Sequence, residues 1–270
     1  MLLIGAGVSS TDIAREMAPL ATNIYQSSRS GDFDLPVHIL PENATRIESI
    51  ESFDIFNIEA DSSQLSEDAH LPVTMKVASG QQLCNIDYII LCTGYMFSLP
   101  FLKDFHNDQL NPLDADERIL VTDGKQIHNL HKDIFYIPDP SLIFVGVPFY
   151  TATFSLFDFQ AIAVAAVLAG RAKLPSEKEM RAEYEARVAT KGYGRHFHSL
   201  REREEEYVVE LLTWINADIA ALGEEPIQGH SDQWLVAKDD QRKRMKFLFA
   251  KDVVDGEGIE KTQLVLPLCS

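Results

Sequence analysis

Three small residues near the start of the chain have the types and spacing of a phosphate-binding turn. The pattern G-x-G-x-x-S places Gly5, Gly7 and Ser10 at the three positions of a dinucleotide fingerprint. The first glycine allows a tight turn, the second lets the backbone approach a pyrophosphate, and a small third residue permits close helix-to-strand packing. The N-terminus of the following helix adds the positive end of a dipole. We therefore expect dinucleotide binding; a turn with no phosphate is the alternative.

The residues after the second expected strand indicate which dinucleotide would bind. An acid at this point binds the ribose 2′-hydroxyl of NAD, whereas an arginine accommodates the 2′-phosphate of NADP. Residues 25–30 read YQSSRS, and the first acid after this second strand is Asp32. Arg29 can form a bidentate pair with a phosphate, and the flanking serines, Ser28 among them, can donate further hydrogen bonds. We expect NADP; a solvated Arg29 without a ligand is the alternative.

Three short elements must position this turn. Residues 2–4 read as the end of a buried strand, residues 9–20 have apolar side chains at helical spacing, and residues 23–26 read as a second strand. A strand, a turn, a helix and a second strand form a βαβ unit, which requires a parallel sheet and a right-handed crossover. The chain should therefore begin as an α/β, Rossmann-like domain.

The next part of the chain changes to short alternating runs. These runs, at 47–50, 55–58 and 73–77, predict an antiparallel β-meander, and 88–92 reads as one buried strand that follows it. A glycine breaks that last strand within Thr93-Gly94-Tyr95. We place a domain boundary near residue 95.

The second half of the chain is expected to be mainly helical. Residues 134–147 read as two short strands, and 153–170 as one long, largely buried helix with a glycine cap. Apolar side chains at helical spacing in 207–215 predict an amphipathic helix. The pattern weakens after about residue 229. The expected divisions are a dinucleotide-binding domain at 1–95, a second domain at 96–175, and a helical extension with a tail at 176–270.

Composition excludes several classes of function. The chain has 24 Lys plus Arg against 41 Asp plus Glu, a net charge of −17, which argues against nucleic-acid and anionic-lipid partners. Basic runs at 201–203 and 242–244 and the acidic run at 202–206 are interpreted as solvated helix faces. Three cysteines, odd in number and without metal spacing, indicate neither a disulfide framework nor a zinc site.

The histidine pairs and the apolar segments predict neither a metal site nor a membrane span. His128 with His131, and His196 with His198, have no third ligand at metal-binding spacing, so we expect surface or loop residues and no metal. No segment has the pattern of a signal peptide, and the most apolar one, 161–169, is too short to span a membrane. We expect a soluble, cytoplasmic protein that acts on a small-molecule substrate; the oligomeric state is not indicated.

Four stretches in a fixed order resemble the flavin-containing monooxygenases. They are GAGVSSTDIAREM with YQSSRSG, DYIILCTGYMFSLPFL, LHKDIFYIPDPSLIFVGVPF and TFSLFDFQAIAVAAVLAGRAKLPS, and they cover about residues 1–215. In that family an NADPH-binding domain is inserted into an FAD-binding domain. The resemblance therefore implies an NADP-binding Rossmann-like domain with a β-meander at 1–95, the C-terminal part of an FAD-binding domain at 96–175, and a helical extension.

The resemblance also implies an activity and a set of cofactor-binding residues. Enzymes of this family, such as the N,N-dimethylaniline monooxygenases, use NADPH to reduce FAD, stabilise a flavin C4a-hydroperoxide formed with O2, and transfer oxygen to an amine nitrogen or a sulfur. The cofactors supply the chemistry, so we expect no catalytic triad. The matching positions here are Gly5, Gly7, Ser9 and Ser10 for the NADP pyrophosphate, Ser28 and Arg29 for the 2′-phosphate, Thr93, Gly94 and Tyr95 along the cofactor cleft, and Gln160 on the helix that returns to the flavin. For Gln160, a hydrogen bond to neighbouring backbone is the equal alternative.

The chain also departs from the family pattern. A first G-x-G-x-x-G for the FAD pyrophosphate, the FxGxxxHxxxY-type signature and the active-site asparagine of the preceding segment are not found in these 270 residues. Two interpretations follow. The chain is either a truncated or mis-started copy of a longer enzyme, or a short, non-catalytic relative that keeps at most NADP binding or a role in interaction.

Overall fold

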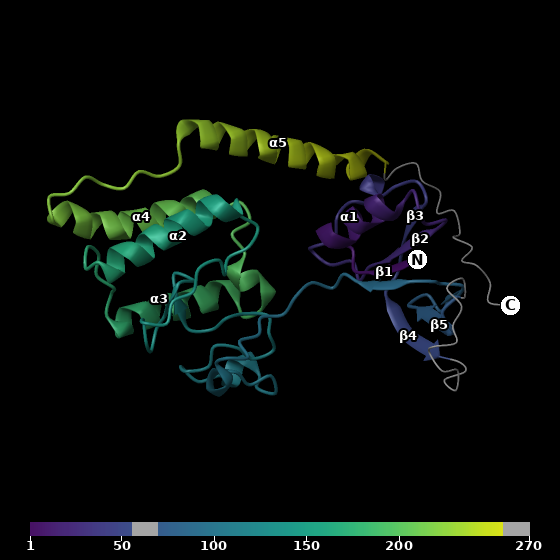
Figure 1. Ribbon diagram of the computed structural model, residues 1–270, viewed down its shortest axis with the longest axis horizontal. Helices are drawn as coiled ribbons and strands as arrows, with labels where there is room; N and C mark the ends of the chain where they lie inside the picture. The colour runs from purple at the N-terminus through teal and green to yellow at the C-terminus, as the bar shows by residue number, and fades with distance from the viewer. Residues whose placement is uncertain (56–69, 256–270) are drawn as a thin grey trace. The chain divides into compact units, whose positions relative to one another are not determined.

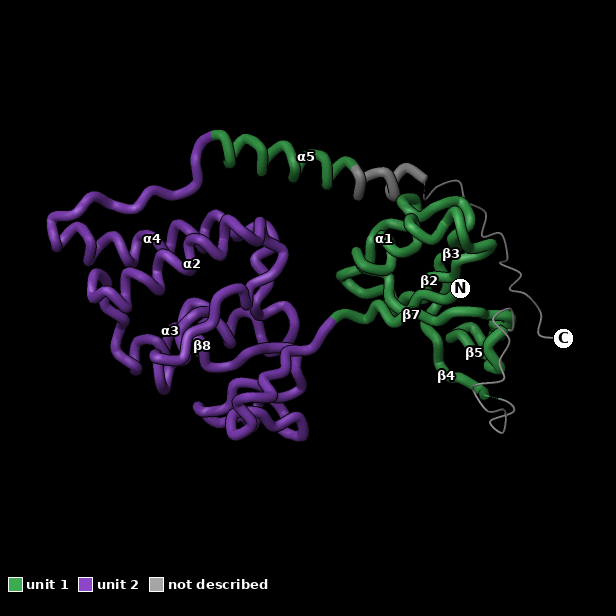
Figure 2. Tube along the Cα trace, viewed as in Figure 1, with its two compact units in different colours: residues 1–94, 233–270 green, residues 95–232 purple. Residues whose placement is uncertain are grey.

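A computed structural model describes residues 1–55 and 70–255 of the chain. These residues form two compact units, the first made by residues 1–94 together with the chain from 233 onward, and the second by residues 95–232 (Figure 2). The expected strand at 55–58 lies, beyond its first residue, outside the described residues, as does Cys269.

A parallel four-stranded sheet is the centre of the first unit (Figure 1). Its strands, in spatial order, are β3 (Ala44–Ile47), β2 (Ile24–Ser27), β1 (Leu2–Ile4) and β7 (Ile89–Leu91). Helix α1 (Val8–Met17) connects β1 to β2, and Leu2 pairs with Tyr25 on one side and Ile89 on the other. The α/β fold and the βαβ unit expected from the sequence are confirmed.

Side chains of the parallel sheet alternate between two cores, as the twofold period of a strand requires. Leu3 and Ile24 pack with Ala14 of α1 on one face, whereas Leu2 packs with Met75 on the other. The second face is covered by an antiparallel sheet of β4 (Ile50–Ile55), β5 (Val73–Val77) and β6 (Gln82–Leu83). A β-meander therefore occupies the place of the helix that usually connects parallel strands.

Two expectations about these strands need correction. The run at 47–50 was expected in the meander, but Ile47 ends the parallel strand β3 and Ile50 begins β4. The strand at 88–92 was expected to be buried, but β7 pairs only with β1 in the described part of the chain, and Leu91 is 73% exposed. An edge strand has one neighbour fewer to cover it.

Three helices and a hairpin form the second unit. Helix α2 (Thr153–Leu168) is followed by Gly170, whose φ of +71° fits the glycine expected after the C-cap. It packs against α4 (Glu204–Ala221). Small side chains such as Ala163 lie between them, which allows the helix axes to approach closely. Both helices are where the sequence predicts them. The remaining elements are the hairpin strands β8 (Leu130–His131) and β9 (Phe135–Tyr136), α3 (Glu177–Lys191), and 3₁₀ turns at Lys103–Phe105, Pro112–Asp114 and Arg195–His198.

Two elements differ from the sequence expectation. The strands expected within 134–147 reduce to β9, which pairs with the preceding β8, and to a single bridge between Phe135 and Ile143. Helix α5 (Asp232–Asp255) was expected only as a solvated helix face around the basic run 242–244, and its full length was not, because its apolar residues do not follow one face. A further 3₁₀ turn, Val37–Ile39, lies in the first unit.

Burial also corrects two interpretations of polar residues. Glu204, in the acidic run taken as a solvated face, is 1% exposed. His128, His131 and His198, expected at surface or loop positions, are buried, although His128 does lie in a loop. Cys84 and Cys92 are free thiols. No helix of the described residues is long and apolar enough to cross a membrane.

Candidate functional site

The carboxyl ends of β1 and β7 form a topological switch point in the first unit. From β1 the chain passes through α1 to β2 on one side, and it reaches β7 on the other side only after β3 and the antiparallel sheet. In open parallel sheets, ligands bind in the crevice outside the carboxyl ends of the strands at such a point. The turn after β1 and the segment after β7 meet here, because the Cys92 N–H donates to the Ile4 carbonyl at 2.7 Å.

Gly5 is required by the fold of the turn itself. Its φ is +115°, and a Cβ at this position would lie 2.3 Å from the carbonyl oxygen of Cys92. Its N–H donates to the carbonyl of Ser27 at 2.9 Å. Only glycine therefore allows the ends of β1, β2 and β7 to come together at this place.

Gly7, in contrast, is not required by the packing of the protein. It is the N-cap of α1 with a φ of −84°, a value open to any residue. A Cβ there would lie 3.5 Å from the Phe33 carbonyl oxygen, an ordinary contact. Within the described residues no side chain caps α1, and its first turn contains no acid. Uncapped N–H groups, a positive dipole end and room for close approach are the features that bind an anion.

Ser9 and Ser10 have different environments. Ser9 is exposed in the first turn of α1, whereas Ser10 is fully buried. The Ser10 hydroxyl donates to the Gly7 carbonyl at 3.0 Å and accepts from Nε2 of Gln26 at 2.7 Å, and Oε1 of Gln26 accepts from Nε of Arg46 at 2.7 Å. Ser10 therefore holds α1 on β2, and only its backbone N–H is left for a phosphate. The sequence signal for this network was a polar Gln26 within a buried strand.

The loop after β2 brings an acid to the residues expected to bind the 2′-phosphate. Ser28 is half-buried, and its hydroxyl donates to Oδ2 of Asp34 while it accepts from the Ser30 N–H at 2.8 Å. Arg29 is exposed and forms no hydrogen bond or ion pair with the rest of residues 1–55 and 70–255. Sequence reasoning stopped at Asp32 and did not identify Asp34, because only the fold of the loop returns it to Ser28.

The Thr93-Gly94-Tyr95 segment marks the division between the units. Thr93 lies beside the glycine turn, since its nitrogen is 3.4 Å from the position of a Cβ on Gly5. Gly94 has a φ of +81°, and Tyr95, the first residue of the second unit, is 98% exposed. The first unit therefore brings together the glycine turn, Thr93 and Gly94, whereas Tyr95 belongs to the other unit.

Gln160 lies in the second unit with both polar groups in hydrogen bonds. Its Oε1 accepts from the Gly146 N–H at 2.9 Å, and its Nε2 donates to the hydroxyl of Tyr207 at 2.8 Å. That hydroxyl donates in turn to the Lys132 carbonyl at 2.6 Å. Burial, opposed in part by the bond from Gln160, raises the pKa of Tyr207 far above its usual range. The side chain of Gln160 thus makes the bond to neighbouring backbone that was one of its two interpretations.

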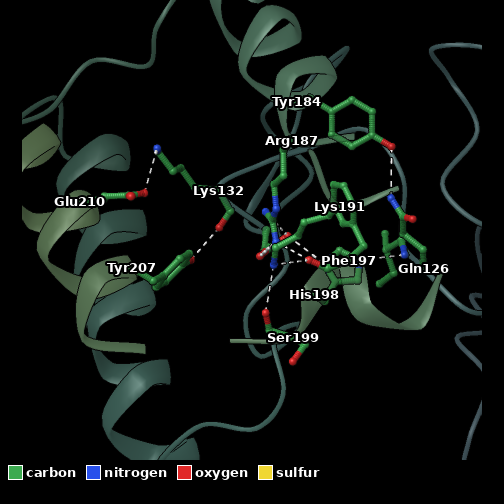
Figure 3. A network of polar contacts seen from close by, with 12 residues as sticks. Gln126, Lys132, Tyr184, Arg187, Lys191, Phe197, His198, Ser199, Tyr207 and Glu210 are labelled. Carbon is green, nitrogen blue, oxygen red and sulfur yellow. Dashed lines mark hydrogen bonds and ion pairs between the residues drawn. The ribbon is translucent and has the colours of Figure 1, made fainter. Parts of the chain in front are cut away.

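A buried ionic network joins three elements of the second unit (Figure 3). Arg187 of α3 forms a bidentate pair with Asp133 at 2.8 Å, and Nδ1 of His198 lies 2.8 Å from the same carboxylate. Burial opposes the charge of Asp133, but contacts with His198 and Arg187 hold its pKa well below the usual range. Because Nε2 of His198 accepts from the Ile127 N–H at 3.1 Å, Nδ1 must be the protonated nitrogen. His198 therefore has no nitrogen available for proton transfer, and the network is structural.

Comparison with known proteins places this geometry in a family. Residues 64–223, more than half of the chain, match the model of the flavin-binding monooxygenase-like family. The chain is 51% identical over 247 residues to flavin-containing monooxygenase ustF2 and 39% identical over 239 residues to ustF1, both from Aspergillus flavus. These matches cover 91% and 88% of this chain but 49% and 43% of the relatives. The chain thus spans about half the length of the curated relatives it matches.

Solved structures show the same fold. An S-allyl-L-cysteine S-oxygenase from Allium sativum is similar with a TM-score of 0.58 and 24% identity, over 91% of this chain and 48% of that one. Tmm from a Pelagibacter species is similar with a TM-score of 0.52 and 20% identity, over 78% and 41%. At these identities the likeness concerns the fold alone, whereas the family rests on the sequence match. The chain belongs to the flavin-binding monooxygenase-like family, a family of flavoprotein oxidoreductases.

Proposed function

We propose that the first unit binds NADP(H) at the carboxyl ends of β1 and β7. The observation that supports this most directly is Gly7, a glycine whose missing side chain serves neither a turn nor a packing contact of the protein. A ligand that approaches the N-terminus of α1 closely would explain why a residue without a side chain is present at position 7. A pyrophosphate fits, because the first turn of α1 offers N–H donors without a competing acid.

Within this proposal each residue of the turn has a separate role. The N–H groups at the start of α1 bind the pyrophosphate, and Gly5 holds the turn against β7. Arg29, exposed on the loop after β2, binds the 2′-phosphate of the adenosine ribose. Thr93, whose backbone lies beside the turn, and Gly94, which follows it, add backbone groups to this site. All of these residues belong to one compact unit.

We further propose that the protein acts as an NADPH-dependent flavin monooxygenase on soft nucleophiles, an amine nitrogen or a sulfur. Reduced flavin, when bound, supplies the electrons that activate O2 for transfer of one oxygen atom. The family match supports the flavin. In the described part of the chain we identify one glycine turn of the phosphate-binding kind, and we assign it to NADP(H). For Gln160 we propose positioning of the Gly146 segment, because its amide is already bonded there.

The activity can be tested with a protein that spans the full length of its relatives. It should be yellow as purified, and it should consume O2 with NADPH when a thioether or a tertiary amine is supplied, with one oxygen atom recovered in the product. A colourless protein without NADPH-dependent oxygen consumption would contradict the monooxygenase proposal. If the same protein still bound NADPH, the non-catalytic NADP-binding alternative would be favoured instead.

A further inference from the structure

Asp34 lies against Ser28, in the loop after β2 where the proposed coenzyme site would distinguish NADH from NADPH. The sequence places it seven residues after β2 ends at Ser27, but the loop folds back so that its carboxylate accepts from the Ser28 hydroxyl. In dinucleotide-binding folds, an acid at the end of the second strand accepts from the ribose 2′-hydroxyl of NAD. The fold of the loop therefore brings the Asp34 carboxylate to the end of β2, where the sequence itself has no acid.

Several hydrogen bonds hold the loop in this arrangement. The Leu35 N–H donates to the Ala6 carbonyl of the glycine turn at 2.8 Å, and Nη2 of Arg46 donates to the Leu35 carbonyl at 2.9 Å. The Asp34 N–H donates to the Gly31 carbonyl at 3.0 Å. The residue after Asp34 is thus tied on one side to the phosphate-binding turn and on the other to β3. Asp34 is a fixed part of the site rather than a free surface acid.

The bond between Ser28 and Asp34 also changes what Ser28 can do. A serine hydroxyl has a single proton to donate, and here it is donated in the hydrogen bond to Asp34. Ser28 can then donate to a 2′-phosphate only if that bond breaks. No ion pair with Arg29 offsets the charge of Asp34 in the described residues. A 2′-phosphate placed between Arg29 and Ser28 would meet one favourable and one like charge.

We propose, building on the coenzyme site proposed above, that Asp34 is a specificity-determining residue of that site. Its carboxylate accepts a hydrogen bond from the 2′-hydroxyl of NADH and repels the 2′-phosphate of NADPH, which Arg29 attracts. The two side chains thus oppose each other, and the site prefers NADPH over NADH less strongly than Arg29 alone would make it. Removing the charge of Asp34 increases the preference for NADPH.

The test is a titration of the full chain with NADPH and with NADH, followed by nicotinamide fluorescence. In Asp34→Asn, NADPH should bind about tenfold more tightly, because a like charge at hydrogen-bond range is gone. NADH should bind less tightly, because an amide oxygen is a weaker acceptor for the 2′-hydroxyl than a carboxylate. Asparagine can still accept from Ser28, so the loop should keep its fold. The gain for NADPH should shrink at high salt, where charge repulsion is screened.

Two variants provide matched comparisons. Asp32→Asn removes an equal charge two residues away and should leave the NADPH-to-NADH affinity ratio within about twofold. Arg29→Ala should lower that ratio by weakening NADPH alone. An unchanged ratio in Asp34→Asn, or an equal change in Asp32→Asn, would overturn the role of Asp34 while coenzyme binding stands. Failure of both coenzymes to bind the wild-type chain would overturn the coenzyme site and this inference together.

Discussion

At the scale of single residues, Gly5 and Gly7 are glycines for different reasons. Gly5 has a positive φ and lies against the Cys92 carbonyl, whereas Gly7 has an ordinary φ and a Cβ there would make only an ordinary contact. The fingerprint treats both as parts of one motif. The structure separates a residue needed for folding from one whose reason is a ligand.

This difference predicts opposite outcomes for two alanine variants. Gly5→Ala should lower the free energy of unfolding by about 2 kcal/mol or more, because the new Cβ would collide with backbone at a positive φ. Gly7→Ala should change it by less than about 1 kcal/mol, the range of N-cap substitutions. It should nevertheless weaken coenzyme binding at least about tenfold, since its methyl group occupies the approach to α1. Denaturant unfolding and coenzyme titration of both variants check this; unimpaired binding by Gly7→Ala would contradict it.

At the scale of elements, α4 stabilises the start of α2. Helix α2 has Ala152 at its N-cap, a residue with no side chain to cap it. Glu204, the first residue of α4, supplies the missing acceptor: its Oε1 accepts from the Ala152 N–H at 2.9 Å. The carboxylate thus lies at the positive end of the α2 dipole. The acidic run read as a solvated face therefore contains one residue that joins two helices.

The bond from Ala152 predicts that the glutamates of this run differ in importance. Glu204→Ala should lower the free energy of unfolding by about 1–2 kcal/mol, because it leaves a half-buried N–H without its acceptor. Glu206→Ala, which removes only the exposed pair with Arg203, should have almost no effect. Denaturant titration followed by far-UV circular dichroism measures both. Equal stability of the two variants would contradict the capping role of Glu204.

At the scale of the whole molecule, buried histidines should make folding sensitive to acid. Burial lowers the pKa of His128 to about 4, with a smaller contribution from His198, and burial lowers that of His131 to about 4. The unfolded chain titrates these groups near 6.5, so between pH 6.5 and 4 it binds more protons than the folded chain. Stability from these residues is therefore complete above pH 6.5 and is lost as the pH falls towards 4.

The expected loss is at most about 3 kcal/mol for each histidine. The free energy of unfolding, measured by denaturant titration from pH 7.5 to 4.5, should fall as the pH decreases. In His131→Leu the slope should be flatter, because one of the two titrating groups is gone while the site stays filled. A slope identical to that of the wild-type chain would show that His131 is not the source.

Structural elements that depend only on consecutive residues could be predicted from the sequence. The glycine turn, the βαβ unit, α2 and α4 follow from spacing, because their period is set by neighbouring backbone positions. The length of helix α5 was missed, although a solvated helix face was expected at 242–244, because its apolar residues do not gather on one face. The exposure of β7 was missed because a strand sequence does not say whether both of its edges are paired.

The sequence by itself determined the family of the chain and the residue types of a dinucleotide turn, because these depend on order along the chain. Only the tertiary structure decided which contacts the polar side chains make. It buries Ser10 against Gln26, brings Asp34 back to Ser28, and joins Asp133 to His198 across 65 positions. Such contacts depend on how elements pack in three dimensions, and no local pattern encodes them. The identity of the turn is thus a property of the sequence, whereas its proposed coenzyme preference depends on the fold.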